Sequence, residues 1–131
     1  MTYYIARTVS RPFDEVLAQT VARLQAAGFG VLCDIDVQAT LKAKIGADLA
    51  RYRILGACNP RFAYEALKLE EKIGLLMPCN VIVRETADGR VEVASIDPLA
   101  SLERTGNAAL ARPALEVRRS LTGVIEGIEE T

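Results

Sequence analysis

Residues 80–97 of this chain read NVIVRETADGRVEVASID. Residues 80–86 and 90–97 have the length of strands and are rich in β-branched side chains. The dipeptide between them, Asp88-Gly89, readily adopts the positive φ angles of a tight hairpin turn. The stretch therefore predicts an antiparallel β-hairpin, and the other elements are placed around it.

Strands and helices alternate along the rest of the chain. Three more runs have the composition of strands, at residues 3–9, 29–35 and 52–58. Four segments repeat apolar residues at helical spacing, at residues 13–27, 37–45, 60–73 and 114–128. This order predicts an α+β fold: a single two-layer domain over residues 1–131, with about five mainly antiparallel strands and helices packed on one face of the sheet.

Capping residues support three of these helices. Ser10, followed by Pro12, is expected to cap the first helix, and Asp36 is expected to cap the second. Asn59 followed by Pro60 matches the residue types preferred just before a helix and at its first position. Each of these three predicted helices therefore starts shortly after a predicted strand.

The charge balance bears on the classes of partner. The chain has 16 basic and 17 acidic residues, a formal net charge of −1, and no run of basic side chains. Binding to nucleic acid depends on clustered Lys and Arg, so no nucleic-acid partner is expected. No apolar stretch is long enough to cross a bilayer, and residues 1–5 lack the features of a signal peptide. We therefore expect a cytoplasmic location and no membrane association.

The three cysteines, Cys33, Cys58 and Cys79, are the side chains expected to react near neutral pH, because the chain has no histidine. Three cysteines are too few, and odd in number, to form a disulfide framework. Free thiols are therefore expected in a reducing compartment. Cys33 lies inside an apolar run and is expected in the core. Without histidine, and with only two other cysteines, neither a metal site nor a cofactor is expected.

Two short motifs contain the other two cysteines and provide the candidate site. One lies where a predicted strand meets a helix, and the other lies where the hairpin begins. Because one helix and a short return separate them, the two motifs could lie side by side. We expect a pocket for a small-molecule ligand lined by both motifs, Cys58-Asn59-Pro60 and Pro78-Cys79-Asn80.

The two thiols have two chemical interpretations. A thiol just outside a helix N-terminus, as predicted for Cys58, is favoured as the thiolate, which lowers its pKa. A neighbouring Cys79 could then form a reversible disulfide with it. Alternatively, both cysteines are small buried side chains at strand ends, as free cysteines commonly are.

Charged residues on the strands suggest two further sites. Asp34 and Asp36 lie on the same side of an extended strand, where two carboxylates could hold a hard cation. Alternatively, Asp36 caps the next helix and Asp34 is solvated. Four strand arginines could hold an anion together, or could form the solvated side of the sheet, and they are Arg7, Arg51, Arg53 and Arg84.

Four segments together resemble one known family. They read DIDVQATL at 34–41, YRILGACNP at 52–60, GLLMPCNVIV at 74–83 and IDP at 96–98. In this order they resemble the domain-of-unknown-function family numbered 302, over nearly the whole chain from about Tyr4 to Ile128. The resemblance implies a compact α/β sandwich with a TATA-binding-protein-like topology, often found as a dimer in small bacterial or archaeal proteins. It implies no established activity.

The expected function is that of a small cytoplasmic domain that binds a ligand or a partner and forms a homodimer. The alternative is a thiol-dependent enzyme or redox sensor, with Cys58 as the reactive thiolate and Cys79 as its resolving partner. A third alternative is a structural assembly protein whose sheet face or edge forms the dimer. A lowered thiol pKa would favour the enzyme, and an inert pair of thiols would favour the other two.

Overall fold

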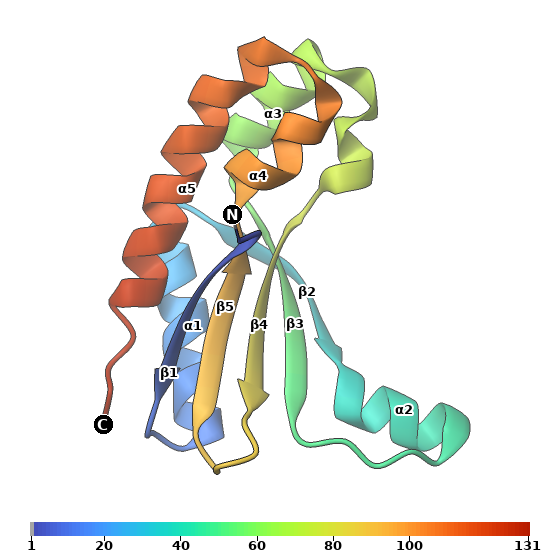
Figure 1. The fold of residues 1–131 in the computed structure, drawn as a ribbon, viewed down its shortest axis with the longest axis vertical. Coiled ribbons are helices and arrows are strands. Elements are labelled where there is room, and N and C mark those ends of the chain that lie inside the picture. The colour runs from blue at the N-terminus through green and yellow to red at the C-terminus, as the bar shows by residue number, and fades with distance from the viewer. Residues whose placement is uncertain (1) are drawn as a thin grey trace.

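Five antiparallel strands form the sheet of this protein, seen in a computed structural model that describes residues 2–131 (Figure 1). The strands lie in the order β1-β5-β4-β3-β2. Their bounds are β1 Tyr4–Val9, β2 Gly30–Asp36, β3 Tyr52–Cys58, β4 Cys79–Glu85 and β5 Val91–Ile96. Each neighbouring pair is antiparallel, so the predicted five-stranded antiparallel sheet is confirmed.

The hairpin predicted at residues 80–97 consists of β4 and β5. Val83 pairs with Val93, and Gly89 turns the chain with a φ angle of +81°. Glycine adopts this angle without steric cost, because it has no Cβ atom. The hairpin lies inside the sheet, since β5 pairs with β1 on its other side and β4 pairs with β3.

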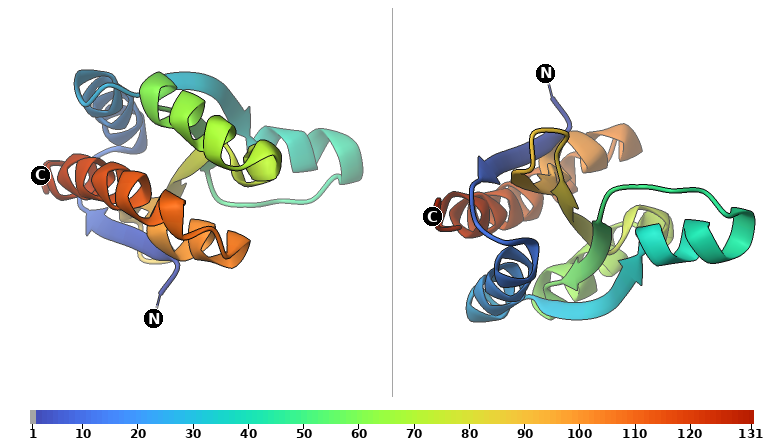
Figure 2. Two further views of the ribbon diagram at one scale, coloured as in Figure 1. Left: turned by 90° about the horizontal axis from the view of Figure 1, so that it is seen from above. Right: turned by 90° about the horizontal axis from the view of Figure 1, so that it is seen from below.

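Helices cover one face of the sheet and extend beyond one of its ends. The two long helices, α1 (Phe13–Ala26) and α5 (Ala111–Glu126), lie against the same face (Figures 1 and 2). Beyond the end of the sheet lie α3 (Pro60–Leu69), the 3-10 helix η1 (Glu71–Leu76) and α4 (Pro98–Leu102). Two more 3-10 turns, η2 (Glu103–Thr105) and η3 (Ala108–Leu110), connect α4 to α5. No helix within residues 2–131 has both the length and the apolar character needed to span a membrane.

The second helix, α2 (Val37–Ile45), is set apart from the others. It projects from β2 at the edge of the sheet, away from α1 and α5 (Figure 2). The predicted packing of helices on one face therefore holds for α1 and α5, while α2 stands clear of that layer.

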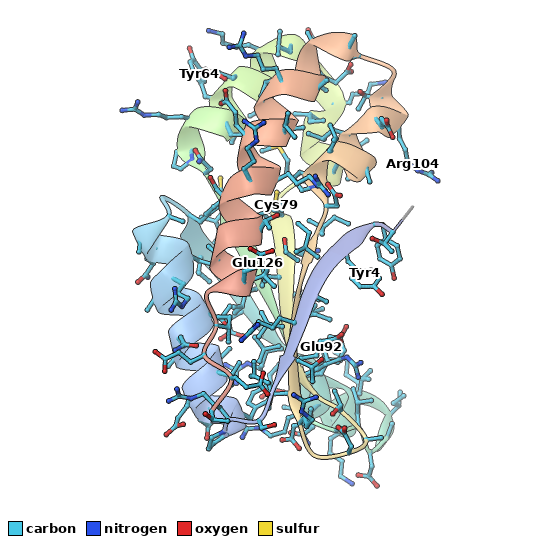
Figure 3. The ribbon with its side chains drawn as sticks, turned by 60° about the vertical axis from the view of Figure 1, so that its left-hand side comes forward. Tyr4, Tyr64, Cys79, Glu92, Arg104 and Glu126 are labelled. Carbon is cyan, nitrogen blue, oxygen red and sulfur yellow. The ribbon has the colours of Figure 1, made fainter. Side chains whose placement is uncertain are left out.

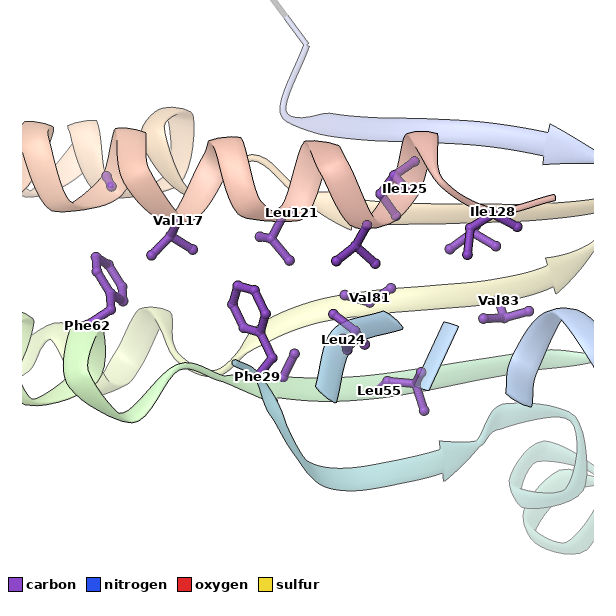
Figure 4. Close-up of a cluster of buried hydrophobic side chains, with 14 of the residues drawn as sticks. Leu24, Phe29, Leu55, Phe62, Val81, Val83, Val117, Leu121, Ile125 and Ile128 are labelled. Atoms are coloured by element: carbon purple, nitrogen blue, oxygen red, sulfur yellow. The ribbon is translucent and has the colours of Figure 1, made fainter. Parts of the chain in front are cut away.

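The core lies between the covered face of the sheet and the helices α1 and α5 (Figure 4). Leu24 of α1 and Ile125 of α5 are fully buried against the sheet. Their counterparts are the inward side chains of the central strands, Leu55, Val81, Val83 and Val93. Each such side chain stabilises the fold by roughly 1.5–3 kcal/mol relative to exposure, so this layer is the main source of stability.

Two predicted helix caps are confirmed. Asp36 Oδ1 accepts a hydrogen bond of 2.9 Å from Ala39 N at the start of α2. Asn59 Oδ1 accepts one of 3.2 Å from Phe62 N at the start of α3. In both cases a short polar side chain satisfies an N–H group that the first turn leaves free.

The predicted cap of the first helix is wrong. α1 begins at Phe13, and the residue in the capping position is Pro12. Ser10 therefore lies two residues too early to reach the first turn. Its hydroxyl accepts a hydrogen bond of 3.1 Å from Arg90 Nε instead.

The helix predicted over residues 60–73 is interrupted. α3 ends at Leu69, Glu70 is extended with a φ angle of −147°, and η1 follows. Asn107 Nδ2 donates a hydrogen bond of 2.8 Å to the Leu69 carbonyl, which satisfies an acceptor at the helix end. Ile73 is still buried, from η1. Apolar spacing thus predicted the buried residue, whereas a distant side chain contributes to the helix end.

A β-bulge in β2 decides the position of Cys33. Val31 pairs with Ala57, but Cys33 rather than Leu32 pairs with Gly56. The extra residue shifts the alternation of side chains by one position. The expectation that Cys33 lies in the core is therefore wrong: Cys33 is exposed, on the face of the sheet that α1 and α5 leave uncovered.

Candidate functional site

Strand alternation divides the second motif between the two faces of the sheet. Cys79 pairs with the fully buried Ala57 and packs against the core, so it lies on the face that α1 and α5 cover. Asn80 pairs with Gly56 and lies on the opposite side, the open face. The side chains of these two adjacent motif residues therefore lie on opposite faces of the sheet.

The Cys79 thiol is held in its protonated form. Burial, and to a smaller extent the neighbouring Cys58, raises the pKa of Cys79 to about 11. The crevice that Cys79 lines together with Phe62 and Met77 has a volume of about 10 Å³, room for at most one water molecule. Cys79 is therefore unsuited to nucleophilic chemistry at neutral pH, and its crevice is too small for an organic ligand.

The first motif forms the junction between β3 and α3. Cys58 is the last residue of β3 and is half-buried, and Pro60 is the first residue of α3. The side-chain oxygen of Asn59 is engaged in capping α3. Asn59 also lines a polar groove of about 280 Å³ between α3 and α5, together with Arg61 and Glu116.

Pro78 and Cys33 lie over Gly56 on the open face. A Cβ atom added to Gly56 would lie 2.6 Å from Cys33 Sγ and 2.9 Å from Pro78 Cγ. Both distances are shorter than carbon and sulfur atoms tolerate, so the position has no room for a side chain. Gly56 thus lets the Pro-Cys-Asn motif and the bulged strand β2 close over β3.

The six motif residues do not share one cavity. Asn59 lines the polar groove between α3 and α5, Cys79 lines the small crevice, and Asn80 lines a hollow on the open face. Cys58 pairs with Gly30 of β2, whereas Cys79 pairs with Ala57, and Cys58 lies near enough to Cys79 to contribute to the raised pKa of that thiol. The structure thus brings the two motifs together at the ends of β3 and β4, while Asn59, Cys79 and Asn80 line three different spaces.

A row of apolar residues crosses the open face through all five strands. Ile35 pairs with Ile54, Ile54 with Ile82, Ile82 with Ala94, and Ala94 with Ala6. Ile35 is 45% exposed, and Ile54 and Ile82 are half-buried. The two long helices lie on the other face, so this row, the isoleucine row, has no helical layer of its own.

Three tyrosines and Asn80 surround a hollow of about 200 Å³ beside the isoleucine row. Tyr3 and Tyr4 come from the N-terminal end and Tyr52 from the start of β3. The rings of Tyr3 and Tyr4 meet edge to face with their centroids 5.2 Å apart. Tyr4 points away from α5, and Tyr3 is 69% exposed (Figure 3). Exposed tyrosines around a hollow are typical of binding surfaces.

The apolar stripe of α2 is a second surface that the fold covers only in part, because Val37 and Leu41 are half-buried. Val37, Leu41 and Ile45 follow one another at four-residue spacing, as predicted, yet no residue of α2 is buried. Ile45 is 73% exposed. An amphipathic helix normally buries its apolar stripe against another element. The projecting position of α2 leaves its stripe available to another molecule.

The two aspartates proposed as a cation site are joined by an arginine instead. Arg53 donates to both oxygens of Asp34, at 2.8 and 2.7 Å, and its Nη1 lies 3.8 Å from Asp36 Oδ2. This guanidinium lowers the pKa of Asp34. Within the part of the chain that the structure describes, no three potential metal ligands come together. The arrangement is that of an ion pair at the edge of the sheet.

The other strand arginines are engaged in the same way. Arg84 Nε donates to Glu92 at 2.7 Å on the open face. Arg51 Nη2 donates a hydrogen bond of 2.6 Å to Asp14, and Arg7 Nε donates one of 2.8 Å to the Ile128 carbonyl. Each guanidinium is therefore held by an acceptor of the chain, and the four do not converge on an anion site.

Sequence reasoning named a sheet face or edge as one possible dimer surface but did not identify the isoleucine row, although its signal is present in β3 and β4. Inward residues such as Leu55 and Val81 are apolar, and so are the outward residues Ile54 and Ile82. A strand with one solvated face would alternate apolar and polar side chains. Central antiparallel strands that are apolar on both sides leave apolar surface on the face that no helix covers.

Comparisons with known proteins bear on the family and the fold. The sequence profile described as "Domain of unknown function DUF302" matches residues 5–128. The solved structure described as "Crystal structure of uncharacterized conserved protein DUF302 from Bacillus stearothermophilus" matches with a TM-score of 0.92 and 24% sequence identity. The match covers 98% of this chain and 100% of that chain, which confirms the α+β fold. A search among curated proteins gives no match.

Proposed function

The chain belongs to the DUF302 family, a domain of unknown function, and we propose that it acts as a partner-binding domain that forms a homodimer. The dimer interface consists of the open face and the apolar stripe of α2. The observation that carries the proposal is the isoleucine row, which crosses all five strands on the face that α1 and α5 leave uncovered.

The isoleucine row favours a partner because of where it lies. Antiparallel sheets that face water carry polar residues on that side. Here the central outward positions of β3, β4 and β5 are Ile54, Ile82 and Ala94. A contiguous apolar surface on a small protein is a common mark of an interaction site. Removing it from water stabilises a complex by about 25 cal/mol for each Å² of apolar surface.

The size of the open face supports an interface that includes α2. Five strands of six or seven residues cover roughly 24 by 20 Å, or about 480 Å². A stable interface typically needs about 800 Å² on each partner. The sheet alone is therefore too small, and the exposed stripe of α2, with Ile45 at its end, is the adjoining apolar surface that enlarges it.

Electrostatics favour a second copy of the chain as the partner. Two molecules of net charge −1 repel each other only weakly. The charged residues Arg84 and Glu92 on the open face neutralise each other at 2.7 Å, so contact with an apolar surface leaves neither of them unpaired. In a two-fold dimer, both apolar surfaces of one chain meet the same two surfaces of the other.

The motif residues take different parts in this proposal. Asn80 reaches the open face, where its amide and the tyrosine hydroxyls would hold a small polar ligand enclosed between the two chains of the dimer. Pro78 closes over Gly56 beside it. The other four motif residues have positioning roles at the junction of β3 with α3 and in the core, and they are Cys58, Asn59, Pro60 and Cys79.

The thiol-dependent alternative has less support. A resolving thiol attacks as the thiolate, and a pKa of about 11 leaves Cys79 only about one part in ten thousand ionised at pH 7. A disulfide also needs two Cβ atoms that face each other. Cys79 pairs with Ala57, while Cys58 is the following, last residue of β3, so the two cysteines are not a directly facing pair.

Light scattering of the purified chain tests the proposal. The wild-type protein is expected to have the mass of a dimer at micromolar concentration. Ile82→Glu places a charge in the centre of the isoleucine row, so this variant is expected to be a folded monomer. A wild-type chain that stays monomeric at high micromolar concentration would contradict the homodimer.

A matched control shows whether the effect belongs to the open face. Leu75 is 83% exposed and lies on η1, outside both proposed surfaces. Leu75→Glu makes the same kind of change at this site and is expected to leave the dimer intact. Equal dissociation by Leu75→Glu and Ile82→Glu would assign the interface to another part of the molecule.

A further inference from the structure

A groove lies at the end of the molecule beyond the sheet. It has a volume of about 250 Å³ and is bounded by α4, η2, η3 and the first turns of α5. None of its lining residues belongs to the isoleucine row or to α2. The groove is therefore separate from the interface proposed above, and binding there does not depend on the dimer.

The floor of the groove is apolar and rigidly placed. Leu102, Leu110 and Ala114 line it and are at most 5% exposed. The walls are made of small residues, including Ala108 and Ala111, which leave the space open. Small-molecule sites are mostly apolar hollows with a few polar groups that fix orientation. This groove has that character at a size suited to a compact molecule.

One charged residue lines the groove. Glu103 is exposed, and its carboxylate has no hydrogen-bond or ion-pair partner among residues 2–131. The neighbouring Arg104 does not line the groove and points outward from the molecule (Figure 3). A free carboxylate at the rim of an apolar hollow favours a ligand with a positive charge.

The side chain of Asn107 and its neighbouring backbone groups are already engaged in hydrogen bonds. Asn107 Oδ1 accepts a hydrogen bond of 3.1 Å from Ala109 N, and Asn107 Nδ2 donates to the Leu69 carbonyl at 2.8 Å. Leu110 N donates to the Asn107 carbonyl at 3.1 Å. These groups are therefore not available to a ligand, and Glu103 is the side chain that brings a formal charge to the lining of the groove.

We infer that this groove binds a small organic cation, whose compact apolar body rests on Leu102, Leu110 and Ala114 and whose charged head pairs with Glu103. The apolar floor provides contact area, and the carboxylate selects the head group. A neutral molecule of the same shape keeps only the apolar contacts. An anion of the same shape meets a like charge in Glu103.

Titration with three probes that share one apolar chain tests this inference by NMR. The probes are hexylamine, hexanol and hexanoate, added to the full chain while the backbone amides of residues 99–114 are observed. Hexylamine is expected to bind best, hexanol less well and hexanoate least, with about a tenfold difference between the first and the last. Hexanoate binding as well as hexylamine, or no shift at these amides at high millimolar concentration, would overturn the inference.

Three variants separate the charge from the cavity. Glu103→Gln is expected to reduce hexylamine binding to the level of hexanol and to leave hexanol unchanged. Ala111→Leu fills the groove and is expected to abolish binding of all three probes. The control is Ala109→Leu, because Ala109 is exposed on η3 and does not line the groove. Binding that survives Ala111→Leu, or a change in the oligomeric mass caused by Ala111→Leu alone, would overturn the inference.

Discussion

Arg118 Nε on α5 donates a hydrogen bond of 3.0 Å to Oδ2 of Asp97, the residue that precedes α4. The other oxygen of the same carboxylate accepts a bond of 3.0 Å from Leu99 N and caps α4. Asp97 is only 6% exposed, whereas the Arg118 side chain is 45% exposed, so the carboxylate is buried under a partly solvated arginine. This contact fixes α4 against α5 and gives the Ile96-Asp97-Pro98 motif a structural role.

Removing the Asp97 carboxylate is expected to destabilise the protein strongly. Asp97→Ala loses a helix cap and a charge-assisted hydrogen bond, which together contribute about 2–4 kcal/mol to the free energy of unfolding. Arg118→Ala should lower the free energy of unfolding by only about 1–2 kcal/mol, because Asp97 still caps α4 in this variant. Urea denaturation of the two variants and of the double variant checks this. If the two losses simply add, the side chains do not interact.

Gly56→Ala is expected to destabilise the fold by about 1–3 kcal/mol, because the new Cβ would overlap Cys33 Sγ and Pro78 Cγ. Thermal unfolding measures the loss. Cys33→Ala removes one of the two obstructing atoms and should restore part of the stability in the Gly56→Ala background. A Gly56→Ala variant as stable as the wild type would show that the two side chains do not close over β3.

Cys79 is expected to react slowly with an alkylating reagent below pH 9, while Cys33, exposed on the open face of the single chain, reacts without unfolding at concentrations where the dimer has dissociated. Burial holds the pKa of Cys79 at about 11, so its rate should rise with a midpoint near that pH. Mass spectrometry of the labelled peptides gives each rate separately. A Cys79 midpoint at or below the free-thiol value of about 8.5 would return support to the thiol-dependent alternative.

The same raised pKa predicts a loss of stability in alkaline solution. The folded state keeps Cys79 protonated, so this contribution is complete below the usual thiol pKa and disappears as the pH rises through about 11. The free energy of unfolding should fall by roughly 2–3 kcal/mol over this range. Urea denaturation at a series of pH values measures it, and Cys79→Ala should remove this part of the decline.

The ion pair of Asp34 with Arg53 predicts the opposite dependence in acid. The pKa of Asp34 is lowered by Arg53, so the pair stabilises the folded state above the usual carboxyl pKa of about 3.9. This contribution is lost as the pH falls through the lowered value. The stability difference between the wild type and Asp34→Asn should therefore vanish in strong acid. The matched control is the same substitution in an Arg53→Gln background, where the ion pair is already absent and Asp34→Asn should show no such dependence.

The parts of the fold that depend on near neighbours could be predicted from the sequence. The hairpin with Gly89 and the caps Asp36 and Asn59 follow from residues within three or four positions of one another. The interruption after Leu69 and the exposure of Cys33 did not follow. The first involves a hydrogen bond from the distant Asn107, and the second arises from a bulge that forms only when β2 pairs with β3.

The candidate site could be predicted only in part for the same reason. The two motifs adjoin because β3 and β4 are neighbouring strands. The faces on which Cys79 and Asn80 lie depend on which side of the sheet α1 and α5 cover, and apolar spacing alone does not specify that side. The isoleucine row likewise appears only when the registers of all five strands are known.

The most direct test of the proposed dimer is an isotope-filtered NOE experiment on an equal mixture of labelled and unlabelled chains. Only contacts between two chains give signals in this spectrum. The account predicts signals from the methyl groups of Ile82 on the open face and Ile45 on α2. No intermolecular signals at high micromolar concentration, or signals from Leu75 and Tyr64 instead, would contradict the dimer through the open face.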